Sequence, residues 1–185
     1  MIQLAVSLAV LLTAVAGADE HLLAGARAFR AGQYDTALVE FRVAEKLDRG
    51  GEAAWYAAAT LQKLGRSEEA VEAFAAAARS GPKAHDALLD YYRAMACYDA
   101  RLYVCADRLL ADLDGKSGPR IEEQARKARA YIAVLFREDP SEATIDWYRA
   151  RMAEARAAGR ETLATAYDEE ASALTARRKQ AGNRR

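Results

Sequence analysis

The chain has 185 residues, of which 52% are hydrophobic and 29% are charged, so it is long enough to bury a full core behind a charged surface. It has only 3 prolines and 11 glycines beside many alanines, and this composition favours helix throughout. The 27 basic and 27 acidic residues cancel, which excludes a strong overall field that would draw the molecule to nucleic acid or to an anionic membrane. We therefore expect an all-α protein without a nucleic-acid partner.

The chain begins with an apolar segment that carries no charged side chain. This segment extends over residues 2–18 and ends in Ala-Gly-Ala before Asp19. Signal peptidase accepts small residues at the first and third positions before such a boundary, and the segment is shorter than the roughly 20 residues of a membrane-spanning helix. We predict a signal peptide over residues 1–18, cleaved after Ala18, and a periplasmic or secreted protein without stable membrane insertion. Because no Lys or Arg precedes the segment, the alternative is an uncleaved anchor that tethers an assembly factor to the membrane.

The stretch over residues 32–44 recurs over residues 65–77. A glycine, an alanine, a phenylalanine and a second alanine are each displaced by 33 residues. The matched pairs are Gly32/Gly65, Ala37/Ala70, Phe41/Phe74 and Ala44/Ala77. A fixed period of this size is typical of a helical repeat array. Small residues let two helices approach closely, and one aromatic side chain fills the space between them.

The repeated positions resemble the tetratricopeptide repeat (TPR), in which a small residue, a glycine, two alanines, an aromatic residue and often a proline stand at fixed places. The first repeat supplies Gly25, Gly32, Ala37, Phe41 and Ala44, and the second supplies Ala58, Gly65, Ala70, Phe74, Ala77 and Pro82. The resemblance implies helical hairpins that stack into a right-handed superhelix. Since alanine-rich hairpins can mimic such a pattern, a non-repetitive helical bundle is the alternative.

Beyond Pro82 the pattern is weaker. Residues 85–98 and 102–113 are expected to form a third hairpin, in which Leu110 takes the aromatic position and alanines take the small positions at Ala94 and Ala106. Residues 120–136 are expected to form a further helix.

Ala143, Trp147 and Ala150 have the spacing of the second helix of a fourth repeat. After Gly159 we expect an amphipathic helix that caps the array, and a disordered basic tail over residues 177–185. The pair Gly159 and Ala164 echoes the first repeat without its aromatic residue, so we interpret it as a degenerate relic or chance. The predicted fold is a TPR-like helical-hairpin solenoid over residues 19–176, with about four hairpins and a C-terminal capping helix.

The chain has two cysteines, Cys97 and Cys105, on either side of the turn of the third hairpin. Positions at about equal distances from such a turn face each other, within the roughly 4.4–6.8 Å Cα separation that a disulfide needs. An exported protein with an even number of cysteines is expected to form this bond. The alternative is two buried thiols on different faces. We expect no metal and no cofactor, because the two histidines, His21 and His85, lack ligand spacing.

In the TPR family the first helix of each repeat lines a concave groove. The resemblance implies that the groove positions of this sequence include Phe29, Trp55, Gln62, Lys63, Tyr91, Met95 and Tyr98. Exposed aromatic side chains on such a wall anchor a bound peptide or helix. The alternative is that C-terminal helices fold back and bury them. The Lys and Asn residues with which chaperone-binding members hold a C-terminal carboxylate are absent, so a co-chaperone role is not implied.

We find no catalytic motif: the chain has no glycine-rich phosphate loop, no Gly-x-Ser-x-Gly and no HExxH. The acidic pairs at residues 68–69, 122–123 and 169–170 are expected to lie on helix surfaces as solvated charges. No glutamate has the apolar setting that a catalytic acid needs. We therefore predict a non-catalytic adaptor or scaffold with a protein or peptide as its partner. The resemblance to TPR proteins and the alanine- and arginine-rich composition imply a bacterial envelope complex as its place of work.

Overall fold

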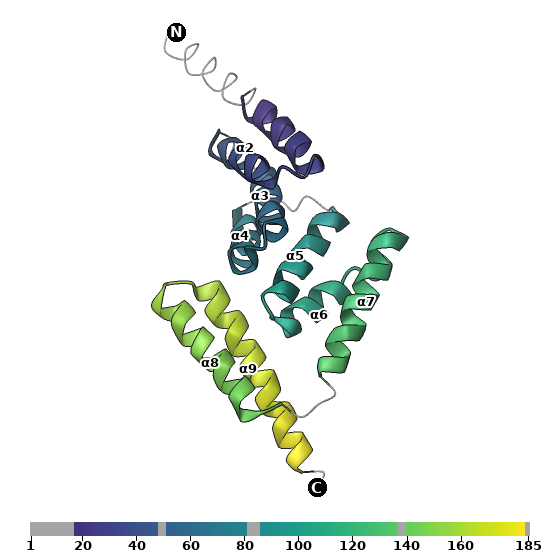
Figure 1. The fold of residues 1–185 in the computed structure, drawn as a ribbon, viewed down its shortest axis with the longest axis vertical. Helices are drawn as coiled ribbons and strands as arrows, with labels where there is room; N and C mark the ends of the chain where they lie inside the picture. Colours follow the sequence, from purple (N-terminus) through teal and green to yellow (C-terminus); the bar gives the residue numbers. More distant parts are fainter. Residues whose placement is uncertain (1–16, 48–50, 81–85, 137–139, 184–185) are drawn as a thin grey trace, which may run out of the picture. The chain divides into compact units, whose positions relative to one another are not determined.

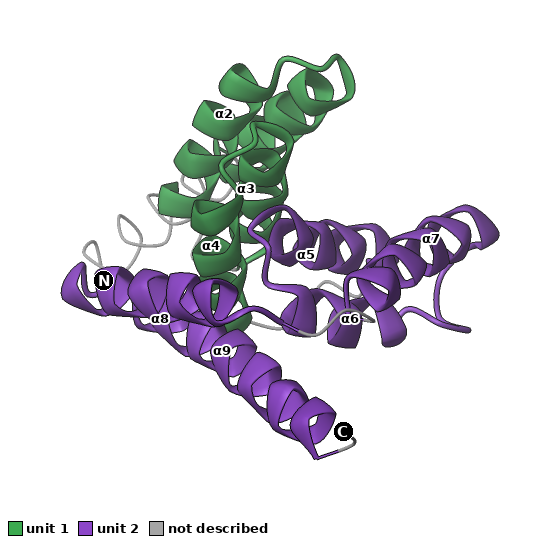
Figure 2. Ribbon diagram, turned by 60° about the horizontal axis from the view of Figure 1, so that its bottom comes forward, with its two compact units in different colours: residues 1–84 green, residues 85–185 purple. Residues whose placement is uncertain are grey.

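The computed structural model describes residues 17–47, 51–80, 86–136 and 140–183, and every regular element in these ranges is a helix (Figure 1). The expected all-α class is confirmed for this part of the chain. The chain divides into two compact units, Met1–Ala84 and His85–Arg185 (Figure 2). Residues 1–16 of the predicted signal peptide lie outside the described residues. Within the described ranges, no helix is both long and apolar enough to cross a bilayer.

Unit 1 consists of two helical hairpins in its described part. Residues 17–30 form a helix that pairs with α2 (Tyr34–Leu47). Helix α3 (Glu52–Lys63) pairs with α4 (Ser67–Ser80). Helix α2 also packs along α3, which joins the two hairpins. The residues that repeat in the sequence form the core. Ala37, Phe41, Ala44, Ala58, Ala70, Phe74 and Ala77 are each no more than 2% exposed.

Gly25 is the point of closest approach in the first hairpin. A Cβ atom added at Gly25 would lie 2.6 Å from the Cδ1 and Cε1 atoms of Phe41. Real Cβ atoms do not approach ring carbons so closely, and the Phe41 ring is fully buried. The predicted combination of a small residue with an aromatic filler is confirmed at this site.

The two helices of each hairpin in the described residues are joined by the same turn. In the first hairpin, the backbone N–H of Gly32 donates to the carbonyl of Phe29, and that of Gln33 donates to the carbonyl of Ala28, a Schellman motif. The central residue of the turn has left-handed backbone angles. It is Gly32 (φ 75°), Gly65 (φ 73°), Arg101 (φ 62°) or Gly159 (φ 70°).

A fully buried alanine follows each of these turns at the same distance. The four alanines are Ala37, Ala70, Ala106 and Ala164. Each donates its N–H to the carbonyl of the residue after the left-handed position, at 2.9 Å. The residues Gly159 and Ala164 therefore form a fourth copy of this turn.

Unit 2 contains two further hairpins and one single helix. Helices α5 (Ala87–Asp99) and α6 (Tyr103–Ala111) form one hairpin, and α7 (Pro119–Leu135) packs against both of them. Helices α8 (Glu142–Ala157) and α9 (Glu161–Gly182) form the other, running side by side (Figure 1). Helix α9 also contacts α6.

The pairing of α8 with α9 corrects the predicted fourth repeat. Helix α8 is the first helix of its hairpin, because its partner α9 follows it in the chain. The predicted core positions Ala143, Trp147 and Ala150 are not among its buried residues and are exposed. The predicted capping helix is thus the partner of α8. The single helix outside the four hairpins of the described chain is α7. Whether the hairpins form a TPR-like solenoid stays a prediction.

A disulfide joins Cys97 and Cys105, with 6.0 Å between their Cα atoms, which confirms the predicted pair. Disulfides persist in oxidising compartments, so the bond fits an exported protein.

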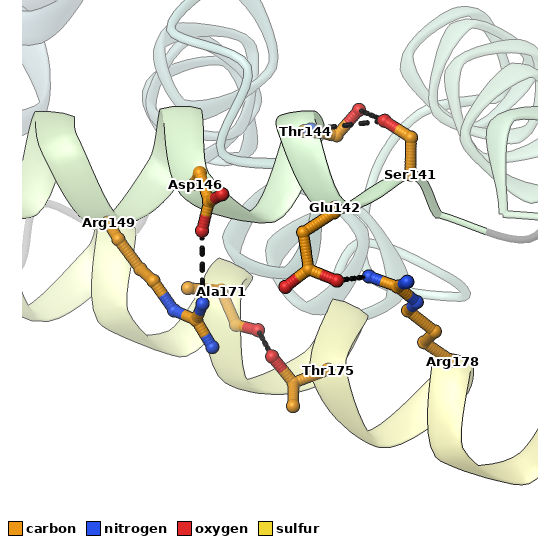
Figure 3. Close-up of polar contacts among 8 residues, drawn as sticks. All are labelled: Ser141, Glu142, Thr144, Asp146, Arg149, Ala171, Thr175 and Arg178. Atoms are coloured by element: carbon orange, nitrogen blue, oxygen red, sulfur yellow. Dashed lines mark hydrogen bonds and ion pairs between the residues drawn. The ribbon is translucent and has the colours of Figure 1, made fainter.

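The prediction of a disordered tail is wrong for residues 177–182, because α9 continues to Gly182. The guanidinium of Arg177 lies over the Phe136 ring, 4.7 Å from its centroid, and Arg178 forms an ion pair with Glu142 (Figure 3). These contacts hold the last turns of α9 to the end of α7 and the start of α8.

Candidate functional site

Unit 2 contains a cavity of about 660 Å³ between the start of α6, the end of α7 and the α8–α9 hairpin. A volume of this size falls in the range of sites that bind small ligands or peptide side chains. Four aromatic and three charged side chains dominate its lining. They are Tyr103, Phe136, Trp147 and Tyr148, and Arg101, Glu170 and Arg177.

Glu170 is the buried charged residue of the cavity wall, with only 1% of its surface exposed. Its carboxylate accepts hydrogen bonds from the backbone N–H groups of Val104 and Cys105. These groups belong to the first turn of α6, whose N-cap residue Leu102 has no side-chain acceptor. Glu170 of α9 therefore caps α6, and its negative charge lies at the positive end of that helix.

The setting of Glu170 changes its acid–base behaviour. Burial raises its pKa to about 7, although the hydrogen bonds from Val104 and Cys105 oppose this rise. The second carboxylate oxygen, Oε2, is buried and has no hydrogen-bond partner in the part of the chain that the structure describes. The expectation that residues 169–170 are both solvated is thus wrong for Glu170 and right for the exposed Glu169.

A sequence signal for Glu170 existed. It lies three residues after Tyr167 and four before Leu174, in line with the buried stripe of α9. A residue at this spacing lies on the apolar face of an amphipathic helix, even when the residues next to it in the sequence are charged.

Tyr148 links the α8–α9 hairpin to the turn that precedes α6. Its hydroxyl donates a 2.7 Å hydrogen bond to the carbonyl oxygen of Arg101. Burial raises the pKa of the Tyr148 phenol, so it remains a protonated donor over the physiological range. Tyr148 and Glu170 thus fix the same corner of the cavity from two different helices.

Arg101 and Arg177 lie against aromatic walls of the cavity. The Arg101 guanidinium is 5.8 Å from the centroid of a Trp147 ring, and Arg177 stacks on Phe136. The cavity therefore combines aromatic walls with the charged side chains of Arg101, Arg177 and Glu170.

The predicted groove residues of unit 1 have different environments. Trp55 is 1% exposed and packs against Phe74, with 5.6 Å between ring centroids, so the expectation of an exposed anchor at Trp55 is wrong. Its ring faces α4, the helix that pairs with α3. Phe29 is half-buried beside Tyr34. Gln62 is half-buried and Lys63 is exposed.

In unit 2, Tyr91, Met95 and Tyr98 are each half-buried. The Tyr98 ring contacts those of Tyr103 and Tyr131, at centroid distances of 5.8 and 6.1 Å. Among the described residues, none of the seven predicted groove positions lines the cavity. Their part in ligand binding stays a prediction.

The described residues contain no group of three or more His, Cys, Asp or Glu side chains placed to hold a metal ion. No protein-family model, curated protein or solved structure matches the chain. The chemistry of the cavity is therefore the basis for assigning a function.

Proposed function

We propose that the protein is a non-catalytic adaptor or scaffold that binds a segment of a partner protein in the cavity of unit 2. The observation that carries this proposal is a cavity of about 660 Å³ with four aromatic walls, one of which, Trp147, is 39% exposed. Exposed aromatic side chains around a cavity are typical anchors for a bound peptide. This cavity replaces Trp55 as the principal anchor site.

The position of Glu170 favours binding over catalysis. One of its carboxylate oxygens accepts a hydrogen bond from the first turn of α6, and the other is buried. A general acid must come within hydrogen-bond reach of its substrate. A carboxylate that caps a helix in this way stabilises the fold.

We also propose that the hairpins are related to TPR and that the protein works in a bacterial cell envelope after export. The shared turn and the buried alanine after it support the relation, and the Cys97–Cys105 disulfide supports an oxidising compartment. The alternative is a membrane-tethered assembly factor that keeps residues 1–18. Mass spectrometry of the protein from its native membrane fraction and soluble fraction distinguishes the two, since export with cleavage predicts a chain that begins at Asp19.

The binding proposal is tested with the full chain and a displayed library of random peptides. Peptides selected by the wild type should lose binding to Trp147→Ala. The matched control is Tyr131→Ala, because Tyr131 is a 52% exposed aromatic residue of the same unit that does not line the cavity. Thermal unfolding of both variants verifies that they fold.

Three outcomes would be informative. Loss of binding in Trp147→Ala alone supports the cavity. Loss in Tyr131→Ala alone moves the interface to α7 and refutes the cavity as the binding site. Failure of the wild type to select any peptide refutes the peptide-binding function.

A further inference from the structure

The hairpin of α5 and α6 differs from the other three hairpins of the described chain in two ways. Its turn has Arg101 in left-handed backbone angles, where each of the other turns has a glycine. Its two helices are also joined covalently, by the disulfide between Cys97 and Cys105. A residue with a Cβ atom loses free energy in left-handed angles, and glycine does not. The turn with the least favourable backbone is therefore the one that is cross-linked.

The segment that the disulfide encloses forms one corner of the cavity of unit 2. Arg101 and Tyr103 lie between the two cysteines in the sequence, and both line the cavity. The carbonyl oxygen of Arg101 accepts a 2.7 Å hydrogen bond from the hydroxyl of Tyr148, and its guanidinium is 5.8 Å from the centroid of a Trp147 ring. The enclosed segment thus contacts α8.

The same segment contacts α9 through the backbone. The N–H groups of Val104 and Cys105 donate hydrogen bonds to the carboxylate of Glu170, which is only 1% exposed. Removing hydrogen bonds from a buried carboxylate costs free energy. The position of the turn and the position of α9 therefore depend on each other.

The disulfide limits how often this corner opens. Closing residues 97–105 into a ring restricts the conformations that the enclosed residues can adopt, which suppresses their local unfolding. When the bond is reduced, the turn regains this freedom, while the left-handed arginine still disfavours the closed form. Reduction therefore weakens the contacts of the turn with α8 and α9.

Building on the proposed function, on which this inference rests, we propose that the Cys97–Cys105 disulfide is a redox switch that controls binding in the cavity. The oxidised form holds the corner of the cavity in place and binds the partner segment. The reduced form loosens the corner and releases the segment. The reductant is a molecule or protein with two thiols.

The reduction transfers two electrons to the disulfide. Cys105 is half-buried and Cys97 is 2% exposed, so a thiolate of the reductant attacks the Sγ atom of Cys105. The bond between the two cysteines breaks, a mixed disulfide forms, and the Cys97 thiolate takes up a proton. The second thiol of the reductant loses its proton and attacks the reductant's own sulfur in the mixed disulfide. Cys105 leaves as a thiolate and is protonated, and the reductant ends as a disulfide.

The test uses the full-length protein in its oxidised form and after reduction by dithiothreitol. The matched control is the double variant Cys97→Ala/Cys105→Ser, which lacks both cysteines of the chain and is measured with and without dithiothreitol. Hydrogen exchange followed by mass spectrometry reads the turn without any ligand. Binding is measured by fluorescence anisotropy, with peptides selected by display on the oxidised protein.

Reduction should speed amide exchange over residues 101–106 by about tenfold or more. Residues 32–37, at the equivalent turn of the first hairpin, should not change, because no cysteine lies near them in the sequence. The affinity for the selected peptides should fall about tenfold, and reoxidation should restore it. The double variant should match the reduced protein with or without dithiothreitol.

Several results would overturn the inference. Exchange over residues 101–106 that is unchanged by reduction shows that the bond does not hold the corner. Faster exchange throughout residues 86–136 and 140–183 shows that reduction unfolds the unit instead of loosening one turn. Faster exchange at the turn with unchanged affinity shows that the turn does not control binding, and leaves the proposed function standing. If the oxidised protein selects no peptide, the proposed function fails and the switch fails with it.

Discussion

Replacing Glu170 with glutamine should stabilise the protein at neutral and alkaline pH. In the structure the carboxylate is buried and caps α6 through the N–H groups of Val104 and Cys105. Glutamine has nearly the same shape and keeps an oxygen that accepts these hydrogen bonds. The substitution therefore removes the cost of burying a charge while it preserves the cap.

The pKa of Glu170 sets the magnitude. Burial raises it from the usual value of 4.5 to about 7. At about 1.4 kcal/mol per pKa unit, this difference destabilises the folded state by about 3 kcal/mol once the group is ionised. The folded state binds the proton more tightly than the unfolded state does, so this contribution is favourable below pH 4.5 and is lost as the pH rises to about 7. The titratable groups that interact electrostatically with Glu170 are Glu169, Tyr103 and Tyr148.

Urea unfolding followed by circular dichroism, repeated from about pH 4 to about pH 9, measures the effect. The Glu170→Gln variant should be more stable than the wild type above about pH 7 by up to about 3 kcal/mol, because the pKa of about 7 already includes the favourable hydrogen bonds from the start of α6. Near pH 4.5 the two proteins should differ little. The control Glu169→Gln changes the exposed neighbour and should lack this pH dependence. A difference between wild type and Glu170→Gln that is constant with pH would refute the reasoning.

Three further substitutions test the fold by urea unfolding. Gly25→Ala should lower the free energy of unfolding by about 1–3 kcal/mol because its Cβ meets the buried Phe41 ring, whereas Gly182→Ala, with nothing within 4 Å, should not. Cys105→Ser should cost about 2–3 kcal/mol without reductant and nothing with it; an equal cost in both would contradict a closed disulfide. Arg101→Gly should be about 1 kcal/mol more stable than Arg101→Ala, since both lose the guanidinium but only glycine relieves the left-handed turn; equal stability would mean that the turn is unstrained.

The first half of the chain was predictable because its sequence period and its packing coincide. Gly25 and Phe41 occupy complementary positions on facing helices, so the spacing in the sequence reports the contact in space. The disulfide was predictable for a similar reason, since the short turn between Cys97 and Cys105 limits where the two residues can lie.

The second half was harder because local spacing is ambiguous in alanine-rich helices. Ala143, Trp147 and Ala150 match the spacing of a second helix, yet all three are exposed, and Ala143 and Trp147 line the cavity. In the second helix of this hairpin, α9, the large buried aromatic residue is Tyr167, three residues after Ala164 instead of four, so the spacing of the first two hairpins did not identify it.

The cavity was not predictable, because its walls come from four helices whose packing no local pattern records. Glu170 illustrates this difficulty. Its spacing places it on the buried face of α9, but only the contact of α9 with α6 reveals it as a cap. Trp55 shows the reverse error, since a helix position assigned to a groove is covered by its own hairpin.

The disulfide of the third hairpin also has a mechanical consequence. The disulfide closes residues 97–105 into a ring. When the unfolded chain is stretched from its two ends, this segment therefore adds only the 6.0 Å between the Cα atoms of Cys97 and Cys105 to its length. The eight-residue separation would otherwise extend to roughly 28 Å. Because the Arg101 turn lies inside the ring, tension on the chain cannot straighten it until the bond is reduced. In force spectroscopy, adding a reductant should therefore lengthen the fully unfolded chain by about 20 Å.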